Sequence, residues 1–236
     1  MNGFINVKEI QENIDFINLA ITLKNIDAKS KEDMLKVCED GNFTFKNLTS
    51  NVQIHSDIVN VVDESNIGQK KDGDSLITNL KNVPLLVFTA DCVPIAIIDK
   101  KNKAVGLAHA GWRGTYEKIA KKTIEGMVNN YKTSVEDIVC IIGPSIGPCC
   151  YEVSKELIEK FNTILTNGEE KFYIIKGSSY YLDLWRINEY ILQRAGVKEK
   201  NIINLNICTS CRCEEFHSYR KHDKTPNRIG MILEIK

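Results

Sequence analysis

Residues 85–114 decide the fold, and they read LLVFTADCVPIAIIDKKNKAVGLAHAGWRG. Residues 85–88 and 95–98 are continuous apolar runs, typical of buried strands. Polar residues separate the two runs, and Pro94 lacks the N–H that a strand ladder needs. This pattern predicts two buried strands with polar chemistry between them.

The same stretch continues into a strand, a glycine turn and a helix. Residues 103–108 predict the strand, and residues 109–114, HAGWRG, predict the turn. Apolar residues at helical spacing follow from 119 to 131, and Thr115 is the expected helix cap. Such a junction exposes side chains for chemistry.

Outward from this stretch, strands and helices follow one another. We expect helices at residues 31–38 and 184–195, and strands at 52–58, 138–142, 202–207 and 229–235. In the 52–58 strand, period two places Gln53, His55 and Asp57 on one face. Alternating helices and strands with adjacent strand pairs predict an α+β (mixed α/β) fold, and the absence of a linker predicts one domain, residues 1–236.

The composition excludes several classes of protein. Of 236 residues, 43% are hydrophobic, and 31 basic residues balance 31 acidic ones. These values argue against a disordered chain and against a general affinity for nucleic acid or membrane surfaces. Residues 1–16 do not resemble a signal peptide, so we expect a cytoplasmic protein. Its eight cysteines are then reduced thiols, and we set disulfides aside.

Two groups of residues are candidates for a metal site. The local group lies within ten residues and consists of Cys208, Cys211, Cys213 and His217, which offer a tetrahedral zinc site. The dispersed group consists of His55, Cys92 and His109, which would leave the fourth position open for catalysis. Both remain open at this point, because spacing alone cannot show which residues meet.

Several ordered motifs resemble the purine nucleoside phosphorylase family once labelled polyphenol oxidase or laccase-domain proteins. They are QIH (53–55), DSLIT (74–78), TADCVP (89–94), AHAGWRG (108–114), IGPSIGPCCYEV (142–153) and FHSYR (216–220). The resemblance covers residues 50–236, whereas residues 1–50 match less well. It implies a compact, layered αββα-type fold.

The resemblance also implies a zinc ion held by His55, Cys92 and His109, which favours the dispersed group. It implies cleavage of adenosine, inosine, guanosine or methylthioadenosine with phosphate, and deamination of adenosine. The expected partners are therefore purine nucleosides and phosphate. The protein itself is expected to be a monomer or a homodimer. A zinc ion with one open position can bind phosphate or activate water.

Other residues receive roles by their position. Asp91 precedes the metal cysteine, so we expect it to orient the site or accept a proton. Arg113 lies beside a predicted helix start and is the expected phosphate contact, with Arg220 and Arg228 as further substrate-binding candidates. Either Trp112 or Tyr219 could stack on a purine.

Three alternatives compete with the phosphorylase. Some relatives are described as peptidoglycan-precursor amidases. The older family label implies a copper-dependent polyphenol oxidase, but a multicopper site needs about ten histidine ligands and this chain has four histidines. The local cysteine group would instead suit a metal-stabilised binding module. A nucleophilic role for Cys149 is disfavoured, because no neighbouring base is evident.

Overall fold

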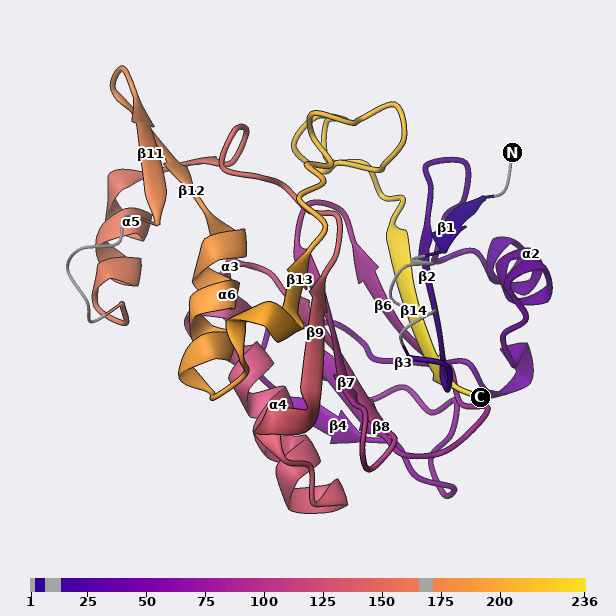
Figure 1. Ribbon diagram of the computed structural model, residues 1–236. Coiled ribbons are helices and arrows are strands. Elements are labelled where there is room, and N and C mark those ends of the chain that lie inside the picture. Colours follow the sequence, from indigo (N-terminus) through magenta and orange to yellow (C-terminus); the bar gives the residue numbers. More distant parts are fainter. Residues whose placement is uncertain (1–2, 7–13, 166–171) are drawn as a thin grey trace.

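Two sheets pack face to face, and helices cover the outer face of each (Figure 1). The coordinates are a computed structural model that describes residues 3–6, 14–165 and 172–236. The layering confirms the expected αββα-type, mixed α and β fold. Part of the N-terminal stretch that we compared with a signal peptide lies outside the described residues.

The larger sheet has six strands, mostly antiparallel, in the order β13–β9–β7–β8–β5–β4. Their bounds are β4 (Val59–Val61), β5 (Ser75–Thr78), β7 (Val93–Asp99), β8 (Ala104–Ala110), β9 (Ile138–Ile142) and β13 (Ile202–Asn204). Its centre is formed by β7 and β8, which pair antiparallel along their whole length.

The second sheet has five strands in the order β1–β2–β14–β6–β3. Their bounds are β1 (Phe4–Asn6), β2 (Ile17–Thr22), β3 (Thr49–Ser50), β6 (Leu85–Thr89) and β14 (Ile229–Ile235). The last strand of the chain, β14, therefore lies in the middle of this sheet, antiparallel to both neighbours. A small third sheet joins β10 (Glu152–Val153), β12 (Ser179–Leu182) and β11 (Tyr173–Lys176).

Period-two alternation assigns each strand residue to one of two layers of core. In β7, Ile95 and Ile97 pack under helices, whereas Ala96 and Ile98 face the other sheet. The helices on that outer side are α3 (Trp112–Tyr116), α4 (Ile119–Tyr131), α5 (Lys155–Asn162) and α6 (Leu184–Arg194). The other sheet is covered by α2 (Lys31–Gly41), which begins at its cap Ser30.

Most of the predicted helices and strands are confirmed, and the polar break between the first two predicted strands proves to be a crossing between sheets. The polar break at residues 90–92 carries the chain from β6 in one sheet to β7 in the other. The predicted single helix is two helices, because Lys118 takes a left-handed φ of 60° between α3 and α4. The first begins at Trp112 rather than near Thr115, since Gly111 is the cap and the Thr115 hydroxyl instead donates to the Ala110 carbonyl. The predicted strand at 52–58 is wrong, for a reason that the site explains.

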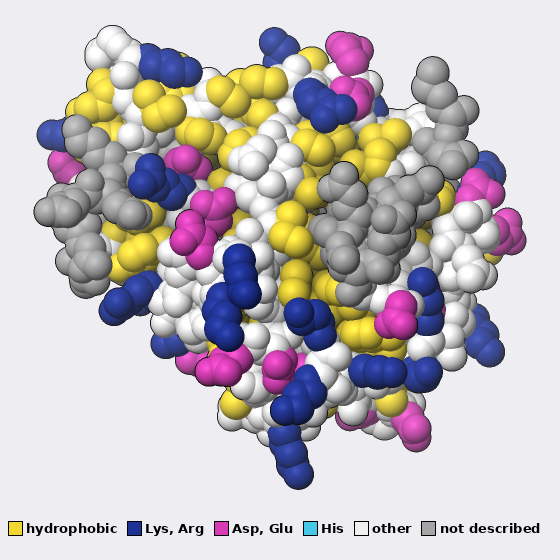
Figure 2. Space-filling view, in the orientation of Figure 1, with side chains coloured by type: hydrophobic (Ala, Val, Ile, Leu, Met, Phe, Trp, Pro, Cys, Tyr) yellow, Lys and Arg dark blue, Asp and Glu magenta, His cyan; other side chains and the backbone are white. Residues whose placement is uncertain are grey.

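The surface mixes charges of both signs, as the balanced composition suggests (Figure 2). Hydrophobic side chains gather over the β11–β12 hairpin, where Ile174 and Ile175 are exposed. Across the described part of the chain, no helix combines the length and the apolar character that crossing a membrane requires.

Candidate active site

The site begins with a pair of neighbouring residues on adjacent strands. Asp74 lies just before β5 and His109 near the end of β8, and the His109 amide donates to the Asp74 carbonyl at 2.7 Å. Both have the same strand parity as Leu76 and Leu107, which face the space between the sheets. Their side chains meet there, with His109 Nδ1 2.8 Å from Asp74 Oδ1.

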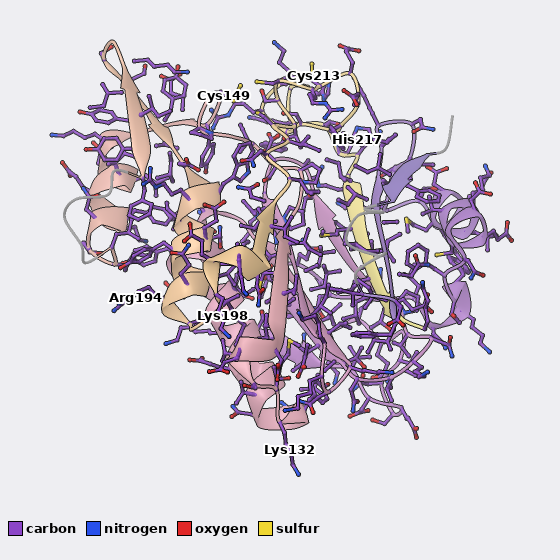
Figure 3. The ribbon with its side chains drawn as sticks, in the orientation of Figure 1. Lys132, Cys149, Arg194, Lys198, Cys213 and His217 are labelled. Carbon is purple, nitrogen blue, oxygen red and sulfur yellow. The ribbon has the colours of Figure 1, made fainter. Side chains whose placement is uncertain are left out.

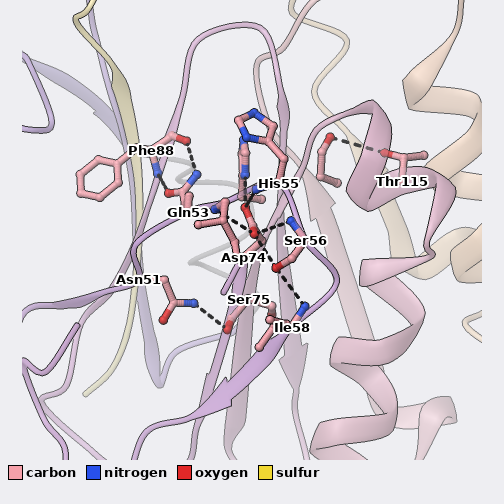
Figure 4. Close-up of polar contacts among 12 residues, drawn as sticks. Asn51, Gln53, His55, Ser56, Ile58, Asp74, Ser75, Phe88 and Thr115 are labelled. Atoms are coloured by element: carbon pink, nitrogen blue, oxygen red, sulfur yellow. Dashed lines mark hydrogen bonds and ion pairs between the residues drawn. The ribbon is translucent and has the colours of Figure 1, made fainter. Parts of the chain in front are cut away.

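The Asp74 carboxylate also organises residues 54–56 (Figure 4). It accepts from the amides of Ile54, His55 and Ser56 and from the Ser56 hydroxyl, at 2.7–3.2 Å. Because the backbone wraps around this buried carboxylate, residues 53–57 form no strand, and His55 takes a positive φ of 59°. A single buried acid therefore orients one histidine and positions another.

Cys92 completes the group from the crossing between the sheets. One ligand atom each from His55, Cys92 and His109 lies within 4.8 Å of the others. The two imidazole rings are nearly perpendicular, at 74°, with centroids 5.0 Å apart. A Cβ on Gly111 would lie 3.0 Å from Cys92 Sγ and 3.1 Å from His55 Cδ2, so only glycine leaves the group its space.

Electrostatic interactions couple the ionisable groups of Cys92, His109 and Asp74. Burial opposes ionisation of Cys92, but the adjacent His109 and His55 outweigh it and lower the pKa of the thiol. Burial likewise opposes charge on His109, but Cys92 and Asp74 outweigh it and raise its pKa. Burial also disfavours the Asp74 carboxylate, yet hydrogen bonds from His109 and Ser56 lower its pKa to about 2. Asp74 is therefore an anion at neutral pH.

The donor set fits a zinc ion in chemistry and in orientation. Two imidazoles and a thiolate are ligands that zinc accepts, and three protein ligands leave one position for a reactant. His109 uses Nδ1 for Asp74, so Nε2 is the atom that faces the group. A carboxylate that holds a ligand histidine in this way is common at zinc sites.

The group opens into a cavity of about 790 Å³ with a basic lining. Its cationic side chains are Lys29, Lys70, Arg113 and Arg228. A smaller adjoining cavity of about 260 Å³ shares His55, Cys92, Arg113 and Tyr219 with it and is more apolar. The His55–Cys92–His109 group thus lies where a basic cavity meets a more apolar one.

The other predicted residues lie around these cavities. Asp91 lines the smaller cavity, but its carboxylate accepts from the Thr209 hydroxyl and the Arg220 amide, both at 2.7 Å. Its observed partners therefore belong to the C-terminal loop, whereas the residue that orients His109 is Asp74. Arg220 also lines the smaller cavity, and its guanidinium donates to the Glu152 carbonyl.

Only two of the four residues in the predicted local group, Cys208 and Cys211, lie close together. Their close neighbours are Cys149 and Cys150, with the ligand atoms of all four within 4.8 Å of one another. We call these four residues the four-cysteine cluster. Cys213 lies on the same loop (Figure 3), and His217 is buried with Nε2 3.1 Å from the Ile26 carbonyl, but neither belongs to the cluster.

Sequence reasoning missed Asp74, Lys29 and Lys70. Asp74 stood in a recognised motif, and its parity on the strand after a polar loop was the available signal. No local pattern distinguishes Lys29 or Lys70 from the chain's other surface lysines.

Known proteins resemble the chain over most of its length. It matches the family described as multi-copper polyphenol oxidoreductase laccase over residues 8–235. It is 33% identical over 218 residues to a purine nucleoside phosphorylase of Clostridium acetobutylicum, covering 89% of this chain and 85% of that protein. Among solved structures, the hypothetical protein YfiH of Bacillus licheniformis has a TM-score of 0.91 at 25% identity, covering 100% of this chain and 97% of that one.

Two further relatives match a shorter region. The human purine nucleoside phosphorylase LACC1 is 35% identical over 150 residues, covering 62% of this chain and 34% of that protein. The match therefore spans about a third of the human relative. The adenosine deaminase RL5, from an unknown prokaryotic organism, is 34% identical over 180 residues, covering 72% of this chain and 68% of that protein.

Proposed function

Because the chain belongs to the multi-copper polyphenol oxidoreductase laccase family, we propose that it is a zinc-dependent purine nucleoside phosphorylase that also deaminates adenosine. Relatives named purine nucleoside phosphorylase support the first activity, and one named adenosine deaminase supports the second. The observation that carries the proposal is the position of the His55–Cys92–His109 group, between a basic cavity and an apolar one.

In phosphorolysis, a phosphate oxygen bonds to the anomeric carbon while the bond from that carbon to the purine nitrogen breaks. Positive charge develops on the ribose and negative charge on the departing base. A bound zinc ion supplies Lewis acidity toward an oxygen at its open position. The protein must hold an anion near that position and must place the nucleoside against it.

The basic cavity provides the anion site. Arg113 lines both cavities, and its guanidinium would contact phosphate at their boundary. Lys29, Lys70 and Arg228 add positive charge around the larger cavity. Their positive charges would stabilise the attacking phosphate anion.

The apolar cavity suits the purine. Trp112, Ile146 and Tyr151 line it, so a flat base would find aromatic and aliphatic surfaces there. Asp74 holds the proton on His109 Nδ1 and thereby keeps Nε2 as the ligand atom. Deamination would use water in place of phosphate, with purine C6 rather than the ribose held at the ligand group.

The test is base release from inosine by zinc-loaded protein, with and without phosphate, resolving ribose 1-phosphate from ribose. We expect phosphate-dependent ribose 1-phosphate, abolished by His55→Ala, which removes an exposed ligand with little effect on packing. The matched control is His222→Asn, which retains an acceptor for the Ser218 amide and should keep its activity.

Ammonia release from adenosine tests the second activity with the same proteins. No turnover of inosine, adenosine, guanosine or methylthioadenosine at full zinc occupancy would refute the proposal. Equal activity in His55→Ala and native protein would refute the placement of the site.

A further inference from the structure

The four-cysteine cluster joins two loops that are distant in sequence. Cys149 and Cys150 lie in the loop between β9 and β10, and Cys208 and Cys211 lie after β13. The sulfur of Cys211 is 3.4 Å from that of Cys149 and 3.4 Å from that of Cys150. None of these residues belongs to the His55–Cys92–His109 group.

We propose that the four-cysteine cluster is a second metal site, which binds one zinc ion through four thiolates. A zinc ion with Zn–S bonds of about 2.3 Å and tetrahedral geometry separates its sulfur ligands by about 3.8 Å. Two of the sulfur–sulfur distances in the cluster are 3.4 Å, and all four sulfur atoms lie within 4.8 Å of one another, which is compatible with that value. Small rotations of the side chains would therefore complete a tetrahedron.

The backbone already fixes the two loops against each other. Ser145 and Cys208 form an isolated parallel bridge, with the Ser145 amide 3.1 Å from the Ile207 carbonyl and the Thr209 amide 3.0 Å from the Ser145 carbonyl. The Gly147 amide also donates to the Cys208 sulfur at 3.3 Å. Amide donors of this kind orient a ligand sulfur and offset its negative charge.

Four protein ligands leave no coordination position for water or substrate, so this zinc ion would stabilise the fold rather than take part in catalysis. The structure that it would hold is the loop of residues 205–228, drawn at the top of Figure 1, which has no helix or strand along its 24 residues beyond the bridge at Cys208. Loops longer than about 15 residues without regular structure are usually functional or disordered, and a metal ion would add a constraint to this one. Tyr219 and Arg220 on this loop line the smaller cavity, so the ion would fix one wall of the active site.

A single zinc ion fits better than the other uses of four thiols. An iron–sulfur cluster places sulfide and several irons between the thiolates, and so requires wider spacing. A disulfide would use two thiols and leave two, although the cysteines are free in this structure. Both alternatives can be recognised in the experiment.

The experiment counts metal in the full chain and follows Co²⁺ as a spectroscopic substitute for zinc. Native protein should bind two equivalents of Zn²⁺. Cys92→Ser should bind one, and its Co²⁺ form should show the strong thiolate-to-cobalt charge transfer of a four-sulfur site. Cys211→Ser should bind one, in the other site. Cys92→Ser/Cys211→Ser should bind none.

Cys213→Ser is the matched control, because Cys213 is two residues from Cys211 and lies outside the cluster. It should still bind two equivalents. Cys149→Ser provides a second ligand variant at an exposed thiol, in case Cys211→Ser folds poorly. Added zinc should also slow proteolysis of residues 205–228 in Cys92→Ser, but not in the double variant.

Three results would overturn the inference. The first is no Zn²⁺ bound by Cys92→Ser at saturation, because that variant retains only the four-cysteine cluster. The second is a loss of metal in Cys213→Ser equal to that in Cys211→Ser. The third is iron with acid-labile sulfide, or a disulfide revealed by two missing thiols, in place of zinc. Because the metal count requires no substrate, these results are independent of the proposed phosphorylase activity.

Discussion

Replacing Asp74 by asparagine tests the central argument about the active site. The buried carboxylate accepts five hydrogen bonds, from the amides of Ile54, His55 and Ser56, the Ser56 hydroxyl and His109 Nδ1. Asparagine retains the shape but replaces one acceptor oxygen by a donor and removes the charge. It therefore cannot satisfy both the residue 54–56 turn and the His109 Nδ1–H.

The magnitude follows from these contacts. Loss of a carboxylate behind a ligand histidine typically weakens metal binding 10- to 100-fold, which corresponds to about 1.4 to 2.7 kcal/mol. Oδ1 accepts two of these bonds and Oδ2 accepts three. Replacing either oxygen by an amide nitrogen therefore breaks at least two bonds to a charged group, and the free energy of unfolding of the metal-free chain should fall by about 3 kcal/mol. Both the site and the fold should therefore respond.

The assay is competition for Zn²⁺ between the protein and a chromophoric chelator, with urea unfolding of the metal-free form alongside. Asp72→Asn is the matched control, because Asp72 is exposed two residues away and should behave as native. If the Asp74→Asn variant bound zinc as tightly as native protein does, Asp74 would not be the group that orients His109.

Three further outcomes follow from other contacts. Gly106→Ala would place a methyl group 2.7 Å from Thr123 Cγ2, and overpacking of this kind should lower the free energy of unfolding by about 1–3 kcal/mol; an unchanged urea midpoint would contradict it. Trp185→Phe removes the indole N–H donated to Ser145 Oγ at 2.6 Å, at a cost of about 1 kcal/mol in the same assay. Burial lowers the pKa of His217 below its ordinary 6.5, so the unfolded chain binds more protons below that pH. Its contribution to stability is present above pH 6.5 and falls as the pH decreases; His217→Gln should therefore reduce the difference in urea midpoint between about pH 7.5 and about pH 5.

Much of the fold could be predicted because its signals are local. Ile95 and Ile98 lie in an apolar run that only a buried strand explains, and Ser30 caps α2 as its residue type suggests. The pairing of strands could not be predicted in this way. The position of β14 between β2 and β6 depends on contacts between residues about 200 positions apart, for example Met231 and Ile21.

The same division holds for the sites. Family motifs pointed to His55, Cys92 and His109, and the structure brings them together. Period two alone misplaced His55 on a strand, because the fold supplies Asp74 as a competing acceptor for the local amides. In the four-cysteine cluster, the distant partners of Cys208 and Cys211 come from a bridge between loops that no local spacing records.

The central position of β14 sets an order on synthesis. All strands of the six-stranded sheet lie between residues 59 and 204, so they leave the ribosome before residues 229–235 do. Until then, β2 and β6 lack the strand that pairs with both, and their apolar inner faces await it. A nascent chain that stalls or terminates before residue 229 therefore exposes two unpaired sheet edges, which favour aggregation. Loss of β14 alone would therefore divide the five-stranded sheet into two separate strand pairs, β1–β2 and β6–β3.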